Sequence, residues 1–156
     1  MRRRRAEKRE PNPDAKCNSR LVAKFINTLM YDGKKTIAEN IVYDVFEILE
    51  QKTGEPNALK VFNKALENIR PRVEVKARRV GGATYQVPIE VPVARGHALA
   101  MRWIRDFARK KKGRPMKNKL ADEFLAAYKG EGAAVKKRDD THKMAESNKA
   151  FSHLRW

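Results

Sequence analysis

Apolar side chains recur at helical spacing, three or four residues apart, over most of this chain. The first three such stretches lie before residue 72, and local signals mark their ends. Ser19 can cap the first stretch, and Asn57 can cap the third. Thr36 and Glu39 have the spacing of a capping box for the second. Pro71 ends the third stretch, since proline disrupts a helix interior. The pattern therefore predicts three helices in the first half of the chain.

Three more helices are predicted in the second half. Residues 98–112 place Trp103 on an apolar face, where it has the spacing of a core residue. Another amphipathic stretch follows Pro115 and closes at Gly130. Residues 133–156 are also helical in pattern, but their large apolar side chains are sparse and lie among lysines and arginines. We expect this last helix to be thinly anchored to the core.

Residues 72–91 are different, because they form the only segment whose apolar residues recur with a period of two. Alternation on both sides of Gly81-Gly82 is typical of a β-hairpin. A two-stranded ribbon is barely stable alone, so its Val/Ile face is expected to lie on the helices. The tip would project, carrying Arg78 and Arg79 beside the glycines.

The parity of the alternation bears on the register of this hairpin. A two-residue loop would place the apolar side chains of each arm opposite polar ones of the other, whereas a three-residue loop would pair apolar with apolar. A loop at 81–83 sets Glu74 against Glu90 and requires Ala83 to adopt the left-handed conformation. A loop at 80–82 avoids both problems and pairs Arg72 with Glu90. The sequence therefore predicts the 80–82 loop.

The predicted fold class is mainly α: a six-helix domain with one protruding β-hairpin between the third and fourth helices. A length of 156 residues suits one domain with a sizeable core. Within it we expect a basic N-terminal arm at residues 1–19 and a helical domain at 20–132, with the hairpin at 72–91. A C-terminal basic helix, residues 133–156, is expected to pack on the same domain.

The net charge of +17 exceeds what solubility needs and indicates a polyanionic partner. Basic residues are concentrated in particular segments: 8 of the first 20 residues are Lys or Arg against 3 acidic, and residues 92–113 hold 7 against 1. Residues 21–71 balance at 7 and 7. The charge is therefore placed on particular segments, while the helical body is ordinary.

Candidate chemistry is scarce. Cys17 stands alone, so no intramolecular disulfide forms, and a reducing, cytoplasmic compartment is expected. The three histidines lie far apart without metal-ligand spacing, and no glycine-rich segment has the pattern of a nucleotide site. No apolar run reaches the length of a membrane span, and the basic N-terminus is not followed by the apolar region of a signal peptide. We expect no cofactor, no metal, no membrane partner and no enzymatic activity.

Nucleic-acid binding by separated basic elements is the function that these observations favour. A flexible arm, a basic ribbon and basic helices suit folded RNA better than straight duplex DNA. Tyr85 and Trp156 are candidates for stacking on bases. Two alternatives stay open, a DNA-architectural protein that uses the hairpin as a minor-groove arm and an RNA-processing enzyme whose site is scattered in sequence. The first lacks the apolar tip residue that such an arm uses to kink DNA.

Several segments resemble the family of bacterial small-subunit ribosomal proteins numbered seven, over almost the whole chain. They are Arg2 to Arg9, Phe25-Ile-Asn with Asp32-Gly-Lys-Lys, residues 67–88, Ala98-Leu-Ala-Met-Arg-Trp, and Gly132-Ala-Ala-Val-Lys-Lys-Arg through Arg155-Trp156. The resemblance implies a structural ribosomal protein that binds the 3′ major domain of small-subunit ribosomal RNA and nucleates assembly of the subunit head. It also implies a position near the exit site, close to transfer RNA and messenger RNA, and contacts with the small-subunit proteins numbered nine and eleven.

The resemblance assigns site residues to two groups. Ribosomal-RNA binding falls on the arm, the turn after the first helix, the hairpin and the fourth helix: Arg2, Arg3, Arg4, Arg5, Lys8, Arg9, Lys34, Lys35, Arg72, Lys76, Arg78, Arg79, Arg95, Arg102 and Arg109. Proximity to transfer RNA and messenger RNA falls on the hairpin tip and the tail: Arg78, Arg79, Gly81, Gly82, Lys136, Lys137, Arg138, Lys143, Lys149, Arg155 and Trp156.

The chain also departs from the family pattern. After the hairpin it reads Pro-Val-Ala-Arg-Gly where the family usually has an arginine-rich run, so Arg95 alone is assigned there. Cys17-Asn18 replaces an aromatic-glycine pair, and Leu154 replaces a tyrosine. We expect fewer phosphate contacts after the hairpin.

Overall fold

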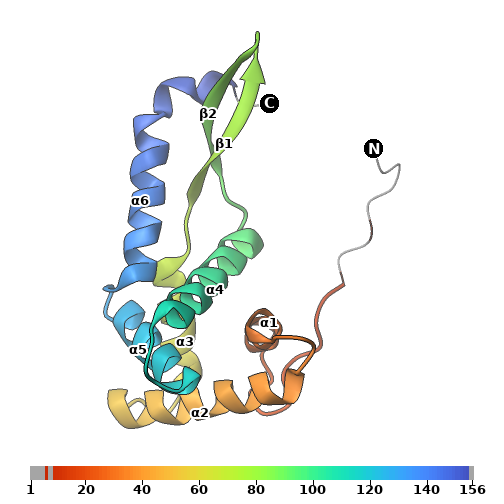
Figure 1. Ribbon diagram of the computed structural model, residues 1–156, viewed down its shortest axis with the longest axis vertical. Helices are drawn as coiled ribbons and strands as arrows, with labels where there is room; N and C mark the ends of the chain where they lie inside the picture. Colours follow the sequence, from red (N-terminus) through yellow and green to blue (C-terminus); the bar gives the residue numbers. More distant parts are fainter. Residues whose placement is uncertain (1–5, 7–8, 155–156) are drawn as a thin grey trace.

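The fold class predicted from the sequence is confirmed by a computed structural model that describes Ala6 and residues 9–154. In this part of the chain, six α-helices surround one core, and the hairpin projects between the third and fourth (Figure 1). A short 3₁₀ helix follows the last α-helix. The elements are α1 Arg20–Leu29, α2 Lys35–Thr53, α3 Ala58–Ile69, β1 Val73–Val80, β2 Ala83–Glu90, α4 Val93–Lys110, α5 Met116–Tyr128, α6 Ala133–Ser147 and η1 Lys149–Leu154.

Most of the predicted helix ends are confirmed. Ser19 accepts a hydrogen bond from the Val22 N–H at 3.5 Å, and Asn57 accepts one from the Leu59 N–H at 3.0 Å. The capping box predicted for α2 is wrong. The turn at Asp32 (φ 51°) and Gly33 (φ 74°) leads directly into the helix, which begins at Lys35 without a side-chain cap. Thr36 therefore lies inside the helix, where it cannot act as the N-cap, and the Glu39 carboxylate lies 3.4 Å from the Lys35 ammonium.

Two helices differ in extent from the prediction. α4 begins at Val93, five residues before the expected start, because Pro92 suits a helix N-terminus and Gly96 packs closely on the end of α3. A Cβ built at Gly96 would lie 2.7 Å from the Arg70 Cγ atom. The last segment is not one helix. α6 ends at Ser147, and the Asn148 side chain bonds the Met144 carbonyl at 2.7 Å, so the chain continues as η1.

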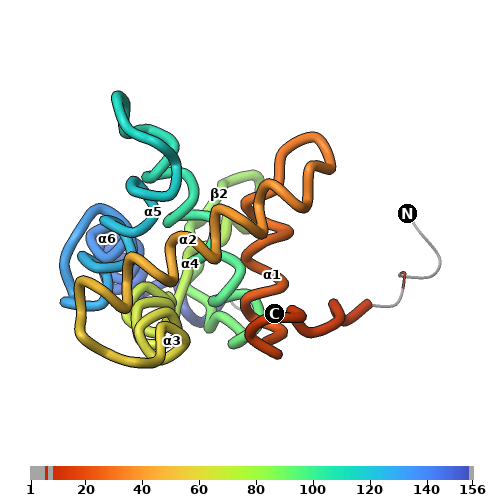
Figure 2. The backbone as a smooth tube through the Cα atoms, turned by 90° about the horizontal axis from the view of Figure 1, so that it is seen from below, coloured from red at the N-terminus to blue at the C-terminus, as the bar shows by residue number. Residues whose placement is uncertain are grey.

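An aromatic cluster forms the centre of the core. The Phe62 ring on α3 lies with its centroid 5.7 Å from those of Phe25 on α1 and Phe46 on α2, and 5.4 Å from that of Phe124 on α5. All four side chains are buried. Figure 2 shows these helices gathered around one centre. Trp103 is partly buried against the same core, as its spacing predicted.

The predicted hairpin register is wrong. Val80 pairs with Ala83, so the loop holds only Gly81 and Gly82, and Val73 faces Glu90. Both glycines have positive φ, 56° and 89°, which is what a two-residue turn matched to the strand twist requires. The prediction assumed that one face of the ribbon was apolar and the other polar.

Both faces of this ribbon in fact have neighbours. Val87 is buried on the same face as Glu74, whereas Val75 on the opposite face is half-buried. β1 packs along α6, and β2 packs against η1, so each arm is covered by the tail (Figure 1). Pairing apolar with polar residues is tolerated here because Glu74 has a dedicated cationic partner, Arg95.

Candidate nucleic-acid interface

The hairpin and the tail form one projecting unit at one end of the helical body (Figure 1). At its base, the backbone N–H of Arg72 donates a hydrogen bond to the His142 Nε2 atom of α6 at 3.0 Å. Further out, the rings of Tyr85 on β2 and Phe151 on η1 lie 5.3 Å apart. The hairpin and the tail, which the resemblance places together near transfer RNA, are thus held against each other.

The accepting role of His142 requires its Nε2 atom to be unprotonated. Burial lowers the pKa of His142, and the positive charge of Arg138 lowers it further, against the opposing effect of Asp139. The neutral ring is therefore favoured in the folded chain. The same packing of the tail on the hairpin explains why Tyr85, a candidate for base stacking, is half-buried in the free protein.

A bidentate ion pair fastens the base of the hairpin to α4. The Arg95 guanidinium donates from Nε and Nη2 to the two carboxylate oxygens of Glu74, at 2.8 and 2.9 Å. The Glu74 side chain is only 11% exposed, and the Lys76 ammonium lies 3.8 Å from it. These hydrogen bonds also raise the pKa of Arg95. Arg95, assigned to RNA on the resemblance, thus has a partner within the fold.

Replacing Arg95 with alanine is expected to lower the free energy of unfolding by about 1–3 kcal/mol, because it leaves a largely buried carboxylate without its main donor. Urea unfolding followed by circular dichroism measures the change. Glu74→Gln combined with Arg95→Ala is the matched control. It removes the uncompensated charge and should recover part of the loss, whereas equal stability of wild type and Arg95→Ala would contradict a structural role for the pair.

Two other assigned arginines also bond acceptors within the fold. The Arg109 guanidinium donates to the Leu29 carbonyl at 3.0 Å, which satisfies an unpaired carbonyl at the end of α1. Arg105, one turn earlier on α4, donates to the Thr28 carbonyl at 3.2 Å. Arg138 donates to the Asn68 carbonyl near the end of α3 and to Asp139. These arginine side chains connect one helix to another, so they contribute to the packing of the helices as well as to the positive charge of the surface.

The remaining assigned cations of the described residues are exposed or partly exposed, and they spread over several elements. The hairpin and tail together carry most of them, whereas Arg102 projects from the middle of α4 and Lys34 and Lys35 lie at the start of α2. The exposed cations of the projecting unit are Arg72, Lys76, Arg79, Lys136, Lys137, Lys143 and Lys149. Arg78 is half-buried, and the tip glycines Gly81 and Gly82 are exposed.

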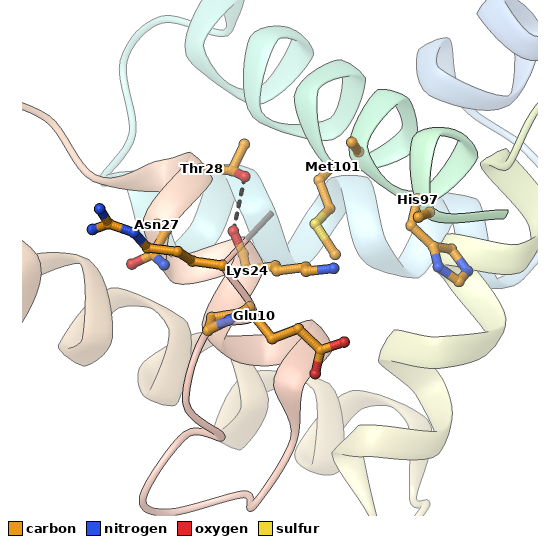
Figure 3. A pocket seen from close by; sticks show the side chains of 10 residues that line it. Glu10, Lys24, Asn27, Thr28, His97 and Met101 are labelled. Atoms are coloured by element: carbon orange, nitrogen blue, oxygen red, sulfur yellow. Dashed lines mark hydrogen bonds between the residues drawn. The ribbon is translucent and has the colours of Figure 1, made fainter. Parts of the chain in front are cut away.

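The N-terminal arm borders a cleft of about 440 Å³ between α1 and α4. Arg9 and Glu10 of the arm, Lys24 of α1, and His97 and Met101 of α4 line it (Figure 3). Glu10 also pairs with Arg20 at 2.5 Å. The arm residues Arg2, Arg3, Arg4, Arg5 and Lys8, and the tail residues Arg155 and Trp156, lie outside the described residues.

His97, on the wall of this cleft, has its Nε2 atom 2.9 Å from a carboxylate oxygen of Glu67. Burial alone would raise the pKa of Glu67, but the hydrogen bond with His97 and the charge of Arg70 outweigh it, and the pKa is lowered. The Arg70 Nε atom donates to the other Glu67 oxygen at 2.9 Å. Glu67 therefore links α3 to α4 through His97 and also binds Arg70 at the end of its own helix.

Within the described part of the chain, no three His, Cys, Asp or Glu side chains are grouped as a metal site would need. No helix of that part has the length and apolar character of a membrane span. Cys17 is partly buried, and burial, then the Asp14 carboxylate, raises the pKa of its thiol, which disfavours the reactive thiolate.

Sequence reasoning missed the residues that hold the hairpin in place. Glu74 was visible as an acidic residue in an otherwise apolar and basic strand, but its partner Arg95 is distant in sequence. The spacing of the three histidines bears only on a metal site or a catalytic pair, and it gives no indication that His142 accepts a hydrogen bond from the Arg72 backbone. Arg105 had a usable signal, because it lies four residues before Arg109 on the same face of α4. The other side-chain hydrogen bonds between separate helices have no recognisable pattern in the local sequence.

Comparison with known proteins identifies the family. The family model described as ribosomal protein S7p/S5e matches residues 1–149. The small ribosomal subunit protein uS7 of Thermotoga maritima is 60% identical over 156 residues, which is 100% of each chain. The uS7 proteins of Fervidobacterium nodosum and Francisella tularensis subsp. holarctica are 57% identical over 100% and 59% identical over 99% of each chain. This chain belongs to the ribosomal protein S7p/S5e family.

Proposed function

We propose that the chain binds the 3′ major domain of small-subunit ribosomal RNA directly and nucleates assembly of the subunit head. In the finished particle, the hairpin and tail lie near the exit site and approach transfer RNA and messenger RNA. The small-subunit proteins numbered nine and eleven are its protein neighbours. Membership of the family makes the chain a structural, non-enzymatic component of the small ribosomal subunit in the cytoplasm, and the proposal extends that role to particular partners.

The observation that carries the proposal is the projecting unit made by the hairpin and the tail. It combines exposed cations on two elements with a rigid base, where Glu74 binds Arg95 and His142 binds the Arg72 backbone. A fixed basic ribbon can enter a groove or a junction of folded RNA and bind phosphates on more than one strand. Arg78 and Arg79, being adjacent in β1, lie on opposite faces of that ribbon.

We assign two classes of basic residue in this interface. Exposed side chains bind phosphates, and among them Lys34, Lys35, Arg72, Arg79 and Arg102 are the strongest candidates for ribosomal RNA. Lys136, Lys137, Lys143 and Lys149 face the exit-site ligands together with the hairpin tip. Arg95, Arg109 and Arg138 act mainly through the fold, because each already donates to an acceptor within the chain. The arm, residues 1–19, and the tail, residues 133–156, extend the interface of the central domain.

Binding to a folded fragment of the 3′ major domain, compared with duplex DNA of similar charge at equal salt, tests the proposal. The RNA fragment is expected to bind tighter. The basic elements of the protein are separated in space and can contact phosphates of an irregular folded RNA together, whereas a straight duplex does not present its phosphates in such an arrangement. Filter binding or gel shift measures both dissociation constants. Preference for the duplex would favour the DNA-architectural alternative and overturn the ribosomal-RNA assignment.

A further inference from the structure

An apolar groove of about 190 Å³ lies at the end of the body where the α1–α2 turn meets the α4–α5 connection. Its walls are mainly apolar, and two cationic side chains, Lys34 and Arg109, stand among them. The apolar lining residues are Leu29, Met30, Tyr31, Ile37, Ala38, Ile41 and Met116.

Tyr31 is unusually exposed for an aromatic residue in an ordered turn. Its relative exposure is 69%, and that of Ile37 beside it is 57%. The turn that carries Tyr31 is held by a hydrogen bond from the Lys34 N–H to the Tyr31 carbonyl at 3.0 Å. Exposing two large apolar side chains costs favourable burial, so an ordered pair of them at one groove indicates a binding surface.

Arg109 helps to hold the Tyr31 ring in a fixed orientation. Its guanidinium carbon lies 5.9 Å from the Tyr31 ring centroid, within range of a cation–π interaction. The hydrogen bond to the Leu29 carbonyl holds the same guanidinium in place. With 69% of the residue accessible, the ring keeps a large surface for a second flat partner.

The charges around the groove select the kind of partner. Lys34 and Arg109 line the groove, Lys35 follows Lys34 in the chain, and three lysines, residues 110–112, follow Arg109. Of the nearby acids, Glu39 lies 3.4 Å from the Lys35 ammonium and Glu123 lies 2.8 Å from that of Lys111, whereas Asp32 is exposed on the turn. The excess of positive charge favours a ligand that is both flat and anionic.

We propose that this groove receives an unpaired base of the bound RNA, stacked on the Tyr31 ring, with the adjoining phosphate bound by Lys34. This rests on the proposed binding of ribosomal RNA and adds a stacking site to it. A paired base has its faces covered by neighbours in the helix, so the site selects a looped-out or bulged nucleotide. Stacking on an aromatic ring accepts any base, because every base has a π face.

The test compares Tyr31→Ala, Tyr31→Leu and Tyr31→Phe with wild type in binding to the 3′ major domain fragment. Tyr31→Ala and Tyr31→Leu are expected to raise the dissociation constant by about 5- to 150-fold, the effect of removing one stacked base, whereas Tyr31→Phe keeps the affinity. Val93→Ala is the matched control, because Val93 is also 57% exposed but lies at the start of α4, away from the groove. It should bind as wild type does.

The salt dependence distinguishes stacking from charge. Tyr31→Ala should leave the slope of log K against log salt unchanged, whereas Lys34→Gln should reduce it by about 0.7–0.9, because one phosphate is no longer neutralised. Unfolding midpoints establish that each variant folds. Wild-type affinity in Tyr31→Ala or Tyr31→Leu, with the wild-type protein binding normally, would overturn the stacking site alone. Failure of the wild-type protein to bind the RNA would overturn the proposed function as well.

Discussion

Raising monovalent salt from about 50 to 200 mM is expected to weaken binding of this chain to the ribosomal-RNA fragment by about 10³- to 10⁵-fold. That range corresponds to roughly 6 to 10 phosphates neutralised by the protein. Each lysine or arginine that binds a phosphate releases counterions that were condensed on the RNA, and this release becomes less favourable as the salt concentration rises. The chain offers enough cations for this, because its net charge is +17 and many of its lysines and arginines are exposed. Dissociation constants measured at four or five salt concentrations give the slope directly.

Double variants that each remove two positive charges show which cations contribute to the salt dependence of RNA binding. Arg72→Gln with Arg79→Gln removes two exposed cations of the hairpin that we assign to ribosomal RNA, and the slope should fall by about 0.7–0.9 for each phosphate that these arginines neutralise. Lys52→Gln with Lys117→Gln removes the same charge from the helical body, where Asp122 and Asp44 already pair with these lysines at 3.4 and 3.1 Å. That control should change the slope less. Equal effects of the two double variants would show that net charge, and not the projecting unit, drives binding.

Phe62→Ala is expected to lower the free energy of unfolding by about 3–5 kcal/mol. Phe62 is 0% exposed, and its ring meets those of Phe25, Phe46 and Phe124, so its removal opens a cavity between four helices. A natural domain has only about 5–15 kcal/mol of stability in total, so this variant should unfold at much lower denaturant. Urea titration of wild type and variant measures the difference.

Phe62→Leu is the control for this prediction, because it keeps most of the apolar volume and should cost less than Phe62→Ala. Ligand binding to the folded state adds apparent stability, so excess RNA fragment should raise the unfolding midpoint of either variant. A decrease below about 1 kcal/mol in Phe62→Ala would mean that neighbouring side chains collapse into the space, which would contradict a close-packed aromatic centre.

The helices are the part of this fold that local sequence determines best. Ser19 and Asn57 cap helices at the positions expected, because the cap and its N–H partner lie within three residues of each other. Gly54 ends α2 in the left-handed conformation, with its N–H bonded to the Glu50 carbonyl. The position of the hairpin between α3 and α4 was also evident, since alternation with a period of two is a local pattern.

The candidate interface was only partly visible from the sequence. The sequence located the basic segments, because charge can be counted without coordinates. It did not show which cations join elements of the fold. Arg109 and Arg138 bond carbonyls of residues about 70 to 80 positions away, and such bonds leave no local pattern. The groove at Tyr31 is likewise formed by two connections that are distant along the chain.

What the sequence by itself determined is the set of helices, the existence of the hairpin and the basic character of the surface, because periodicity, capping and charge all act over a few residues. Tertiary structure alone decided the hairpin register. Arg95 compensates the buried Glu74, and the tail covers both arms, so the two-residue glycine turn is favoured over the apolar pairing that parity predicted. Register depends on what covers each face of a ribbon, and here those covering residues come from α4, α6 and η1.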